Sequence, residues 1–369
     1  MAAKKLKVAI VCDWLLGIGG AERVVYELHK MYPDAPIYTS QYDPNAIDWF
    51  INADVRTTWL QKLPKSLKKF LPILRAMTFH NLNLRGYDLV ISSSGAEAKG
   101  IRTGKNTVHI SYCHAPTHYY WVRPEEYMKN PGFPTGFNWL ARLSLKLLIK
   151  PLKKWDRHAA QEPDYYITNS EASAGLIKKF YGRDASVVHP PVETARFKPT
   201  IKTDPRHGFI IAGRQVPYKR FDLAIEACNE IGVPLIVIGN GPEHKKLEKM
   251  AQRNVTFLTN VSDNDIVQHF QSSVGFIFPG MEDFGIVAVE AMAAGTPVIA
   301  YAKGGALDYV IPGKTGLLFE KQTVDSLKKA LESALTKSFD NDFIVSHASK
   351  YSVNEFTKNM RKLIDSNLK

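Results

Sequence analysis

Two glutamates eight residues apart form the most specific chemical pattern in the sequence. Glu282 follows an apolar run typical of a strand, and Glu290 falls about two turns into the apolar stretch that comes next. A carboxylate among so many apolar residues is costly to bury unless a partner binds it, and two neighbouring ribose hydroxyls would do so. The backbone amides of Phe284, Gly285 and Ile286 begin the same predicted helix and can face a phosphate. The stretch therefore indicates a nucleotide site.

Two cations lie in a second motif, GRQVPYKRFD, between a predicted strand and a predicted helix. They are Arg214 and Lys219. In doubly wound sheets this position faces the ligand. The two cations can neutralise a diphosphate, the arginine as a planar fork and the lysine as a point charge. Taken alone, the motif is explained more simply by two solvated loop charges.

A glycine-rich turn, GIGGAER at residues 17–23, follows the first predicted strand. Gly19 and Gly20 permit close backbone approach, and the helix that starts near Ala21 points its positive end at whatever binds there. A phosphate or a carboxylate suits this end, and an ordinary strand-to-helix turn is an equal alternative. The turn departs from the dinucleotide fingerprint, because the third glycine and the acidic residue of a second strand are missing.

Four further residues are candidates for the site. His114, in a CHAP turn after a strand, either satisfies a buried hydrogen bond or belongs to the catalytic site. Asp13, directly after the first strand, is either a carboxylate on the acceptor side or a turn cap. Tyr119 and Tyr120 could line the acceptor side of a cleft, although aromatic runs more often form core packing.

Short β-branched runs alternate with amphipathic stretches along the chain, the pattern of parallel α/β units. A stretch rich in proline and lysine at 187–208 lacks periodicity and predicts a linker. We expect two doubly wound, Rossmann-like domains, an acceptor domain at 1–195 and a donor domain at 205–350, with the active site in the cleft between them. The last helix, 352–369, is expected to pack back on the first domain. The predicted strands are 7–12, 36–40, 88–94, 107–113, 164–170, 208–213, 234–239, 255–259, 274–280 and 297–301.

Nearly all of the net charge of +12 lies in the first half. Residues 1–200 hold 28 lysines and arginines against 17 acids, whereas residues 201–369 hold 20 against 19. A solvated basic surface, a phosphate-bearing substrate or an anionic membrane explains this excess, and nucleic acid is the least favoured partner. Residues 61–75 and 140–158 interleave apolar and basic side chains, a pattern that favours the membrane.

The sequence shows neither the pattern of a signal peptide nor that of a membrane-spanning helix. The apolar run after the first lysines is too short for a signal peptide, and no segment has the length of a spanning helix. Three cysteines without paired spacing fit a reducing compartment. We expect a cytoplasmic protein, peripheral on the inner face of the plasma membrane.

Three motifs in this order and spacing, GGAER, GR-x4-K and E-x7-E, resemble glycosyltransferase family 4. The residues at 111–121, 155–170 and 187–199 resemble the O-antigen and related mannosyltransferases of that family. The likeness runs from about residue 7 to residue 335. It implies the GT-B fold, an α/β fold of two Rossmann-like domains that face each other across a cleft, and sugar transfer with retention of anomeric configuration.

The resemblance also implies roles for the residues of the motifs. Arg214 and Lys219 bind the donor diphosphate, and Glu290 takes the ribose hydroxyls. Glu282 and the backbone after it hold the sugar, and His114 contacts the sugar near the reacting carbon. The glycine loop abuts the phosphate and the acceptor. The motifs leave the acceptor pocket undefined.

The expected function is hexosyl transfer from a nucleotide-sugar donor, GDP-mannose first and a UDP-hexose or UDP-N-acetylhexosamine next. The expected acceptor is a lipid-linked glycan or a polysaccharide in cell-surface glycan synthesis. A sugar-nucleotide epimerase, a phosphorylase and a silent glycan-binding scaffold remain alternatives. Asp263 and Asp265 have the D-x-D spacing of metal sites in other glycosyltransferase folds, but here they indicate a helix cap. We therefore expect no metal and no cofactor.

Overall fold

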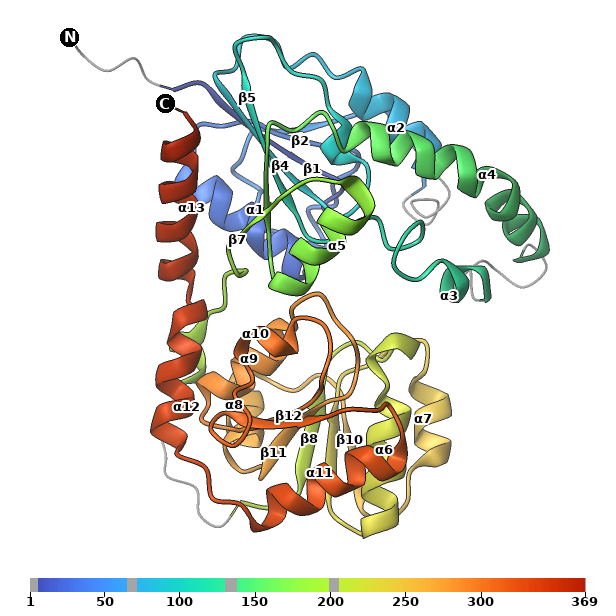
Figure 1. Ribbon diagram of the computed structural model, residues 1–369, viewed down its shortest axis with the longest axis vertical. Helices are drawn as coiled ribbons and strands as arrows, with labels where there is room; N and C mark the ends of the chain where they lie inside the picture. The colour runs from blue at the N-terminus through green and yellow to red at the C-terminus, as the bar shows by residue number, and fades with distance from the viewer. Residues whose placement is uncertain (1–5, 65–71, 130–137, 199–205, 369) are drawn as a thin grey trace. The chain divides into compact units, whose positions relative to one another are not determined.

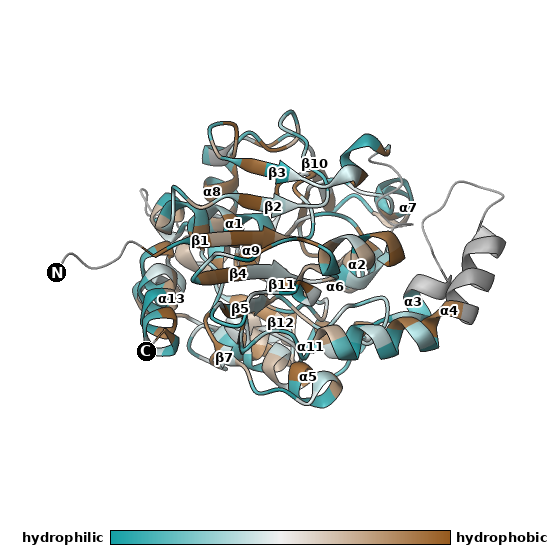
Figure 2. Ribbon diagram, turned by 90° about the horizontal axis from the view of Figure 1, so that it is seen from above, coloured by the Kyte–Doolittle hydropathy of each residue, from teal (hydrophilic) through white to brown (hydrophobic). Residues whose placement is uncertain are grey.

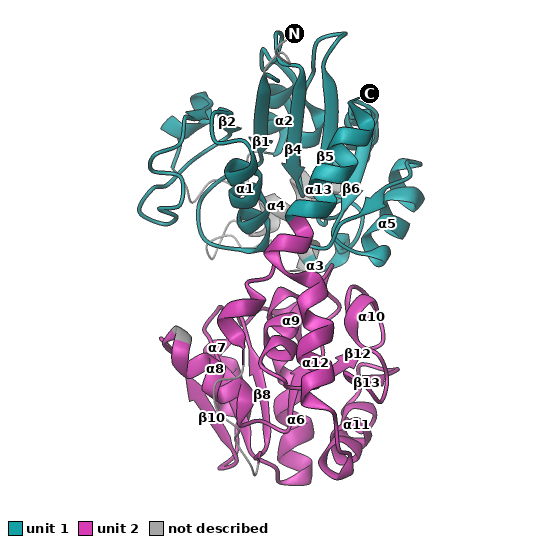
Figure 3. Ribbon diagram, turned by 90° about the vertical axis from the view of Figure 1, so that its left-hand side faces the viewer, with its two compact units in different colours: residues 1–189, 357–369 teal, residues 190–356 magenta. Residues whose placement is uncertain are grey.

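The computed structural model describes residues 6–64, 72–129, 138–198 and 206–368 (Figure 1). The chain divides into two compact units, residues 1–189 with 357–369 (unit 1) and residues 190–356 (unit 2), which Figure 3 shows in different colours. The change of unit after residue 189 falls inside the predicted linker stretch. The last helix, α13 (Val353–Asn367), begins in unit 2 and ends in unit 1.

Unit 1 is built on a seven-stranded sheet in the order β3-β2-β1-β4-β5-β6-β7, with every strand parallel to its neighbours. The strands are β1 (Val8–Cys12), β2 (Ile37–Thr39), β3 (Val55–Thr57), β4 (Leu89–Ser94), β5 (Val108–Cys113), β6 (Tyr165–Thr168) and β7 (Ser186–Val187). The helices are α1 (Gly20–Met31), α2 (Pro72–His80), α3 (Pro124–Lys129), α4 (Asn138–Ala159) and α5 (Glu171–Tyr181), with 3₁₀ turns η1 (Trp59–Lys62) and η3 (Ala98–Gly100).

The central strands of unit 1 are buried along their whole length. All five residues of β1 and all six of β4 are buried, as expected of a parallel sheet covered on both faces. Figure 2 shows β1 as a hydrophobic band. The covering helices are capped by local signals: the Ser170 hydroxyl accepts from the amide of Ser173 at the start of α5, and Gly182 ends that helix with a left-handed conformation.

Unit 2 repeats the architecture with six parallel strands in the order β10-β9-β8-β11-β12-β13. The strands are β8 (Phe209–Ala212), β9 (Leu235–Ile238), β10 (Val255–Leu258), β11 (Gly275–Phe278), β12 (Val298–Tyr301) and β13 (Gly316–Phe319). The helices are α6 (Phe221–Ile231), α7 (His244–Met250), α8 (Asp263–Gln271), α9 (Ile286–Ala293), α10 (Ala306–Tyr309), α11 (Val324–Thr336) and α12 (Asn341–Ala348), with 3₁₀ turns η4 (Thr194–Phe197), η5 (Pro217–Lys219) and η6 (Ser349–Tyr351).

All ten predicted strands are present, and three more strands of the described residues were missed. The missed strands β3, β7 and β13 are three, two and four residues long and lie at sheet edges. An edge strand is buried less than a central one, so its sequence carries little of the apolar run on which the prediction relied. Within the described residues, no helix combines the length and the apolarity needed to cross a bilayer.

Each sheet has one point at which the strand order reverses direction. In unit 1 this point lies between β1 and β4, and in unit 2 between β8 and β11. Loops that leave the carboxyl ends of two such strands diverge to opposite sides and open a crevice, which is where ligands bind in sheets of this kind. The predicted site residues follow three of these strands, β1, β8 and β11, and the neighbouring β5.

Candidate active site

An ion pair joins two loops at the reversal point of unit 2. Lys219 lies in η5, after β8, and Glu282 lies in the loop between β11 and α9. The Lys219 Nζ is 2.8 Å and 3.0 Å from the two carboxylate oxygens of Glu282. The two side chains are 15% and 17% exposed, so the pair lies at the surface of the loops without being fully solvated. The structure thus brings together two residues that are 63 positions apart.

Glycine at two positions lets these loops pack tightly. A Cβ on Gly280 would lie 2.8 Å from the carbonyl oxygen of Tyr218 and 2.9 Å from the Cα of Lys219, so the loop after β11 touches the backbone that carries the cation. Gly285 has φ +95°, a conformation that favours glycine, and a Cβ there would lie 2.3 Å from the ring of Phe278. These glycines fix where Lys219 and Glu282 meet.

Helix α9 carries the second glutamate of the motif. It begins at Ile286, two residues later than predicted, because Gly285 is its N-cap and breaks the helical geometry. Phe284 is buried, and its carbonyl accepts a hydrogen bond from the Tyr309 hydroxyl at 3.0 Å. Glu290 is 5% exposed in the second turn. The amides of the first turn of α9 therefore follow within a few residues of Glu282.

Arg214 is exposed two residues after the end of β8. Its neighbour Gln215 is fully buried and ties the loop down. The Gln215 amide donates to the carbonyl of Gly239 at 2.9 Å, and its oxygen lies 2.7 Å from Nδ1 of His244. Sequence reasoning missed this anchor, because the residue types of the loop do not mark Gln215 as buried. The anchored backbone presents Arg214 at the rim of the sheet edge that also carries Lys219.

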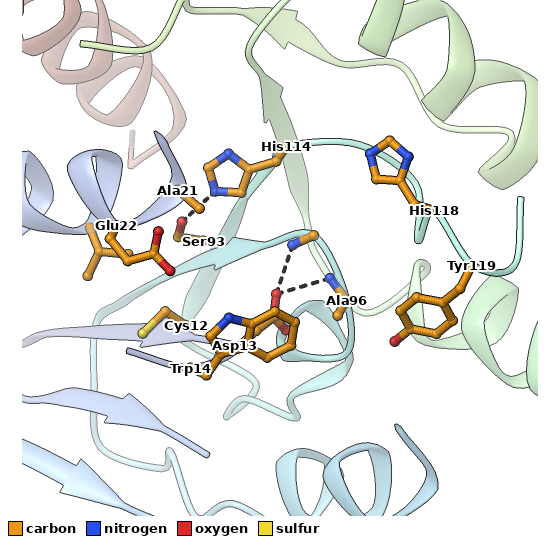
Figure 4. Close-up of a pocket in the computed structure, with 12 residues that line it drawn as sticks. Cys12, Asp13, Trp14, Ala21, Glu22, Ser93, Ala96, His114, His118 and Tyr119 are labelled. Carbon is orange, nitrogen blue, oxygen red and sulfur yellow. Dashed lines mark hydrogen bonds between the residues drawn. The ribbon is translucent and has the colours of Figure 1, made fainter. Parts of the chain in front are cut away.

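Unit 1 contains a pocket at its own reversal point, with a cavity volume of about 240 Å³. Its walls come from the carboxyl ends of β1, β4 and β5, the loops after them, and the first turns of α1 (Figure 4). The lining residues are Cys12, Asp13, Trp14, Ala21, Glu22, Val25, Ser93, Gly95, Ala96, His114, His118 and Tyr119. The pocket thus contains three of the predicted site residues.

Asp13 holds the loop after β4 in place. One carboxylate oxygen accepts from the amides of Gly95 and Ala96 at 2.8 Å and 3.0 Å, and the other accepts from the amide of Ala98 at 2.8 Å and from the Ser94 hydroxyl at 3.4 Å. The residue is 8% exposed. Four donors on two oxygens favour the turn-capping alternative over direct acceptor contact.

His114 lines the pocket from the loop after β5. Its Nε2 lies 2.9 Å from the hydroxyl of Ser93 on β4, and its ring packs edge-on against Tyr112 at 5.2 Å between centroids. Its backbone amide and carbonyl are also bonded, to Ser94 and to the Ser173 hydroxyl. The ring is therefore held in one orientation at the pocket wall. A second histidine, His118, lines the same pocket and was not predicted.

The two predicted tyrosines have different environments. Tyr119 lines the pocket, and its hydroxyl donates to a carboxylate oxygen of Glu97. Burial and the charge of Glu97 raise the pKa of Tyr119 well above its ordinary value, so the phenol stays protonated. Tyr120 is fully buried and contributes no pocket wall. Its burial favours the alternative of core packing, and the acceptor-side role of Tyr120 stays a prediction.

The N-terminus of α1 already has a carboxylate beside it. Gly19 is the N-cap, and Glu22 three residues later folds back, so that a Cβ on Gly19 would lie 2.7 Å from Glu22 Oε2. A glutamate three residues after the N-cap lies where a side chain can reach back toward the start of its own helix. A donor phosphate at Gly19 and Gly20 would have to share this end with Glu22. This geometry disfavours the predicted phosphate contact at the glycine loop.

Two fully buried ion pairs lie behind the pocket. Arg75 of α2 is 2.7 Å from Glu97, and its guanidinium also stacks on the ring of Trp14 at 5.0 Å. Lys99 is 2.6 Å from Asp156 of α4. Although burial lowers the pKa of Lys99, the charge of Asp156 and their hydrogen bond outweigh it, and the pKa is raised. Both pairs support the walls rather than the cavity.

The D-x-D pattern of the sequence lies at the start of α8. Ser262 is the N-cap; its hydroxyl accepts from the amide of Asp265 at 3.2 Å and lies 2.6 Å from the Asp265 carboxylate. The first contact is an N-cap hydrogen bond, and in the second the Ser262 hydroxyl donates to the Asp265 carboxylate. The placement of Asp265 agrees with the helix-cap interpretation of the sequence, and the side chain of Asp263 lies outside the description.

Known proteins resemble the chain in sequence and in structure. It is 30% identical over 206 residues to a D-inositol 3-phosphate glycosyltransferase of Mycobacterium sp. (strain KMS), a match that covers 49% of this chain and 47% of that protein. The chain therefore spans about half the length of this curated relative. The crystal structure of Anabaena Alr3699/HepE in complex with UDP matches with a TM-score of 0.72 at 19% identity, over 98% of this chain and 100% of that one.

The sucrose-phosphate synthase of Thermosynechococcus elongatus matches similarly, with a TM-score of 0.71 at 18% identity over 98% of this chain and 99% of that one. These likenesses confirm the predicted α/β fold of GT-B type with two Rossmann-like domains. The family profile described as Glycosyltransferase Family 4 matches residues 18–196, and the profile described as Glycosyl transferases group 1 matches residues 192–351. Since the two profiles together extend from residue 18 to residue 351, the chain belongs to glycosyltransferase family 4.

Proposed function

We propose that the protein transfers a hexose from a nucleotide-diphosphate donor to a hydroxyl of a glycan acceptor, with retention of anomeric configuration. The observation that carries this proposal is the edge of unit 2 at which Arg214, Lys219 and Glu282 follow two adjacent strands. Two cations beside a helix N-terminus suit a diphosphate. Glu290, 5% exposed on the same helix, suits the ribose hydroxyls.

In the proposed reaction the bond between the anomeric carbon and the diphosphate oxygen breaks, and a bond from that carbon to the acceptor oxygen forms on the same face. The acceptor proton passes to the departing phosphate oxygen, so no protein nucleophile is required. Negative charge develops on the leaving diphosphate. Arg214 and Lys219 stabilise that charge, and Glu282 keeps the lysine in position by the 2.8 Å contact described above.

Two donors are the first to test. GDP-mannose is favoured by the likeness of residues 111–121, 155–170 and 187–199 to mannosyltransferases. UDP-glucose is next, because Anabaena Alr3699/HepE was crystallised with UDP and glucose. The proposed acceptor is a lipid-linked glycan. The curated relative is named for inositol 3-phosphate, so inositol and its phosphate belong in the acceptor panel.

A thermal-shift screen with GDP- and UDP-sugars, followed by a transfer assay with the stabilising donor, tests the function. A donor at about 100 times its Kd should stabilise the folded chain by roughly 2.7 kcal/mol. Release of nucleoside diphosphate with an α-anomeric product from an α-anomeric donor supports the proposal. Binding without turnover supports a silent scaffold, and consumption of inorganic phosphate with release of sugar phosphate supports a phosphorylase; either result contradicts a transferase.

We further propose that unit 1 binds an anionic membrane through η1 and α2. Trp59, Ile73 and Met77 are 53%, 40% and 59% exposed there, and Lys62 lies at the end of the same 3₁₀ turn, η1, that begins at Trp59. Exposed apolar side chains beside cations suit a layer of anionic headgroups. Two basic stretches were noted in the sequence. Residues 65–71 of the first stretch, 61–75, lie outside the described residues, and the second stretch, 140–158, lies within α4.

Vesicle flotation tests the membrane proposal. The wild-type chain should float with vesicles rich in phosphatidylglycerol and not with phosphatidylcholine alone. The double variant Trp59→Ser with Met77→Ser should float several-fold less, because it removes most of the apolar contact. Leu307→Ser, which removes a side chain 53% exposed on unit 2, is the matched control. Equal flotation of the double variant and the control would contradict the assignment.

A further inference from the structure

Strand β4 ends in three serines, although it is a central strand of a parallel sheet. Such strands are normally continuous apolar runs, because both of their faces are covered. Ser92, Ser93 and Ser94 are nevertheless all buried. A buried hydroxyl is costly unless it makes a hydrogen bond, so each serine needs a partner that explains its presence. Ser94 has such a partner in Asp13, at 3.4 Å.

The other two serines make the same contact with two different histidines. The Ser92 hydroxyl lies 2.9 Å from Nε2 of His109, and the Ser93 hydroxyl lies 2.9 Å from Nε2 of His114. The surroundings of the two pairs differ. His109 is fully buried on β5, and neither it nor Ser92 is among the described residues that line the pocket of unit 1. Ser93 and His114 both line that pocket, and Figure 4 shows the bond between them.

The backbone contacts of His114 do not by themselves fix its ring. The backbone amide donates to the carbonyl of Ser94 at 2.9 Å, and the carbonyl accepts from the Ser173 hydroxyl at 3.2 Å. The ring packs edge-on against the fully buried Tyr112. The torsion that turns an imidazole about its bond to Cβ is roughly two-fold, so packing distinguishes poorly between a ring and its flipped form. The contact with Ser93 does distinguish them, because a flip would turn a carbon atom toward the hydroxyl.

The same hydrogen bond selects the position of the ring proton. In a neutral imidazole only one nitrogen carries a proton, and which one does so is set by the hydrogen bond that the other nitrogen makes. A hydroxyl held against Nε2 by a central strand therefore determines the chemical character of Nδ1. The pair of Ser92 with His109 has the same geometry but has no contact with the pocket.

We infer that Ser93 is a positioning residue for sugar transfer: its hydroxyl holds the imidazole of His114 in one orientation and one tautomer at the pocket wall. The inference rests on the proposed function and on the predicted place of His114 in the catalytic site. It deepens that function by adding a residue that acts only through His114. Ser92, by contrast, belongs to the interior of the sheet.

A double-mutant cycle on the full chain tests whether Ser93 acts through His114. Turnover is measured at pH 7 as release of nucleoside diphosphate from GDP-mannose or UDP-glucose, whichever the chain consumes. Ser93→Ala should lower kcat about tenfold, the effect of one hydrogen bond. His114→Ala should lower kcat at least as far, and adding Ser93→Ala to it should have no further effect. A serine that only supported the fold would lower kcat by the same factor in both backgrounds.

Ser92→Ala is the matched control. It removes a hydrogen bond of the same length, from the neighbouring position of the same strand, to a histidine that is not among the described residues of the pocket wall. The free energy of unfolding should fall at least as far as in Ser93→Ala, because the fully buried His109 loses the partner of its Nε2. The kcat of the folded variant should nevertheless remain that of the wild type.

Nitrogen-15 NMR of protein with labelled histidine reads the tautomer without an activity assay. At alkaline pH imidazoles are neutral, so the two ring nitrogens give different signals according to which carries the proton. The signals of His114 are those missing from His114→Gln. They should show a single tautomer in the wild type and in Ser92→Ala, and a mixture of both tautomers in Ser93→Ala.

The outcomes separate the inference from the function on which it rests. If the wild type consumes no donor, the proposed function fails, and the NMR comparison still decides whether Ser93 sets the ring of His114. If a donor is consumed, three results would each overturn the inference and leave the donor assignment in place. They are multiplying effects of Ser93→Ala and His114→Ala, an equal loss of kcat in Ser92→Ala, and an unchanged tautomer in Ser93→Ala.

Discussion

The two units carry the same topology with opposite chemistry at the same place. In both, the strand order reverses beside the first strand of the unit, and loops from two adjacent strands meet there. In unit 1 these loops form a pocket lined by two carboxylates. The nearby cations, Arg75 and Lys99, are buried behind the walls in ion pairs with acidic residues. In unit 2 the loops carry Arg214, exposed, and Lys219, 15% exposed.

The difference teaches that the fold supplies the position and the loop residues supply the function. Burial distinguishes the two uses of charge. Ion pairs with side chains at most 4% exposed, as in unit 1, cost much to break because the remaining charge is left without water. A pair that keeps part of its surface in water, as in unit 2, remains accessible to a ligand and costs less to break than a fully buried one. Charge should therefore determine stability in unit 1 and turnover in unit 2.

Removing Asp156 should produce the largest loss of stability. Asp156→Ala leaves Lys99 buried without its partner and removes the acceptor of Trp121 and Tyr181, so the free energy of unfolding should fall by about 3–5 kcal/mol. All six tryptophans lie in unit 1, at 14, 49, 59, 121, 139 and 155, so denaturation followed by tryptophan fluorescence reports on this unit. Asp184→Ala, which breaks the exposed pair with Lys178, is the control and should cost less than about 1 kcal/mol. Equal losses in the two variants would remove the distinction by burial.

Removing either cation of unit 2 should mainly affect turnover. Arg214→Ala and Lys219→Ala should each lower kcat by roughly two to three powers of ten, or about 3–4 kcal/mol in transition-state stabilisation, with little change in unfolding. Lys246→Ala, which removes an exposed lysine paired with Glu243 in the same unit, is the control and should keep the wild-type kcat. Near-wild-type turnover in both test variants would refute the assignment of charge to catalysis.

The sequence predicted more of the scaffold than of the site. Central strands such as β1 and β4 are buried on both faces, so their short β-branched runs were enough to predict them. The contact of Lys219 with Glu282 could not be predicted in that way, because it depends on β8 lying beside β11 and on glycine at position 280. Trp14, Glu22, Ser93 and His118 were missed as pocket residues, since each becomes a neighbour of the others only when β1, β4, β5 and α1 converge.

Acid should weaken unit 1 through a histidine in its sheet. His109 on β5 is fully buried, its Nε2 is 2.9 Å from the Ser92 hydroxyl, and burial lowers its pKa to about 3. In the unfolded chain the histidine has an ordinary pKa near 6.5 and binds a proton at mildly acidic pH, whereas in the folded chain it stays neutral. The free energy of unfolding therefore has its full value well above pH 6.5 and falls as the pH drops toward 3. Between pH 7 and pH 5 the loss should reach about 2 kcal/mol.

Tryptophan-detected urea unfolding at pH 7, 6 and 5 measures this effect. His109→Gln keeps a hydrogen-bonding side chain without the titration, so its unfolding free energy should change less with pH than that of the wild type. The absolute stability of the variant is not the readout; the slope against pH is. A variant with the wild-type slope would show that His109 does not carry the acid sensitivity. The central strands of unit 2, FIIA, GFIF and VIAY, contain no titratable side chain apart from Tyr301, which makes the contrast one between units.

The smallest expected effect concerns metal. If the cations of unit 2 supply the positive charge for the leaving diphosphate, chelation with EDTA should leave kcat unchanged, whereas a metal held by the D-x-D of α8 would make activity depend on it. Ser262→Ala should reduce stability by about 1 kcal/mol by removing the N-cap and should leave kcat unaltered. Asp265→Asn, which keeps the side chain's size and removes its charge, should likewise retain turnover. Loss of activity in that variant, restored by added Mn²⁺, would show that a bound ion, and not Arg214 and Lys219, neutralises the charge of the leaving diphosphate.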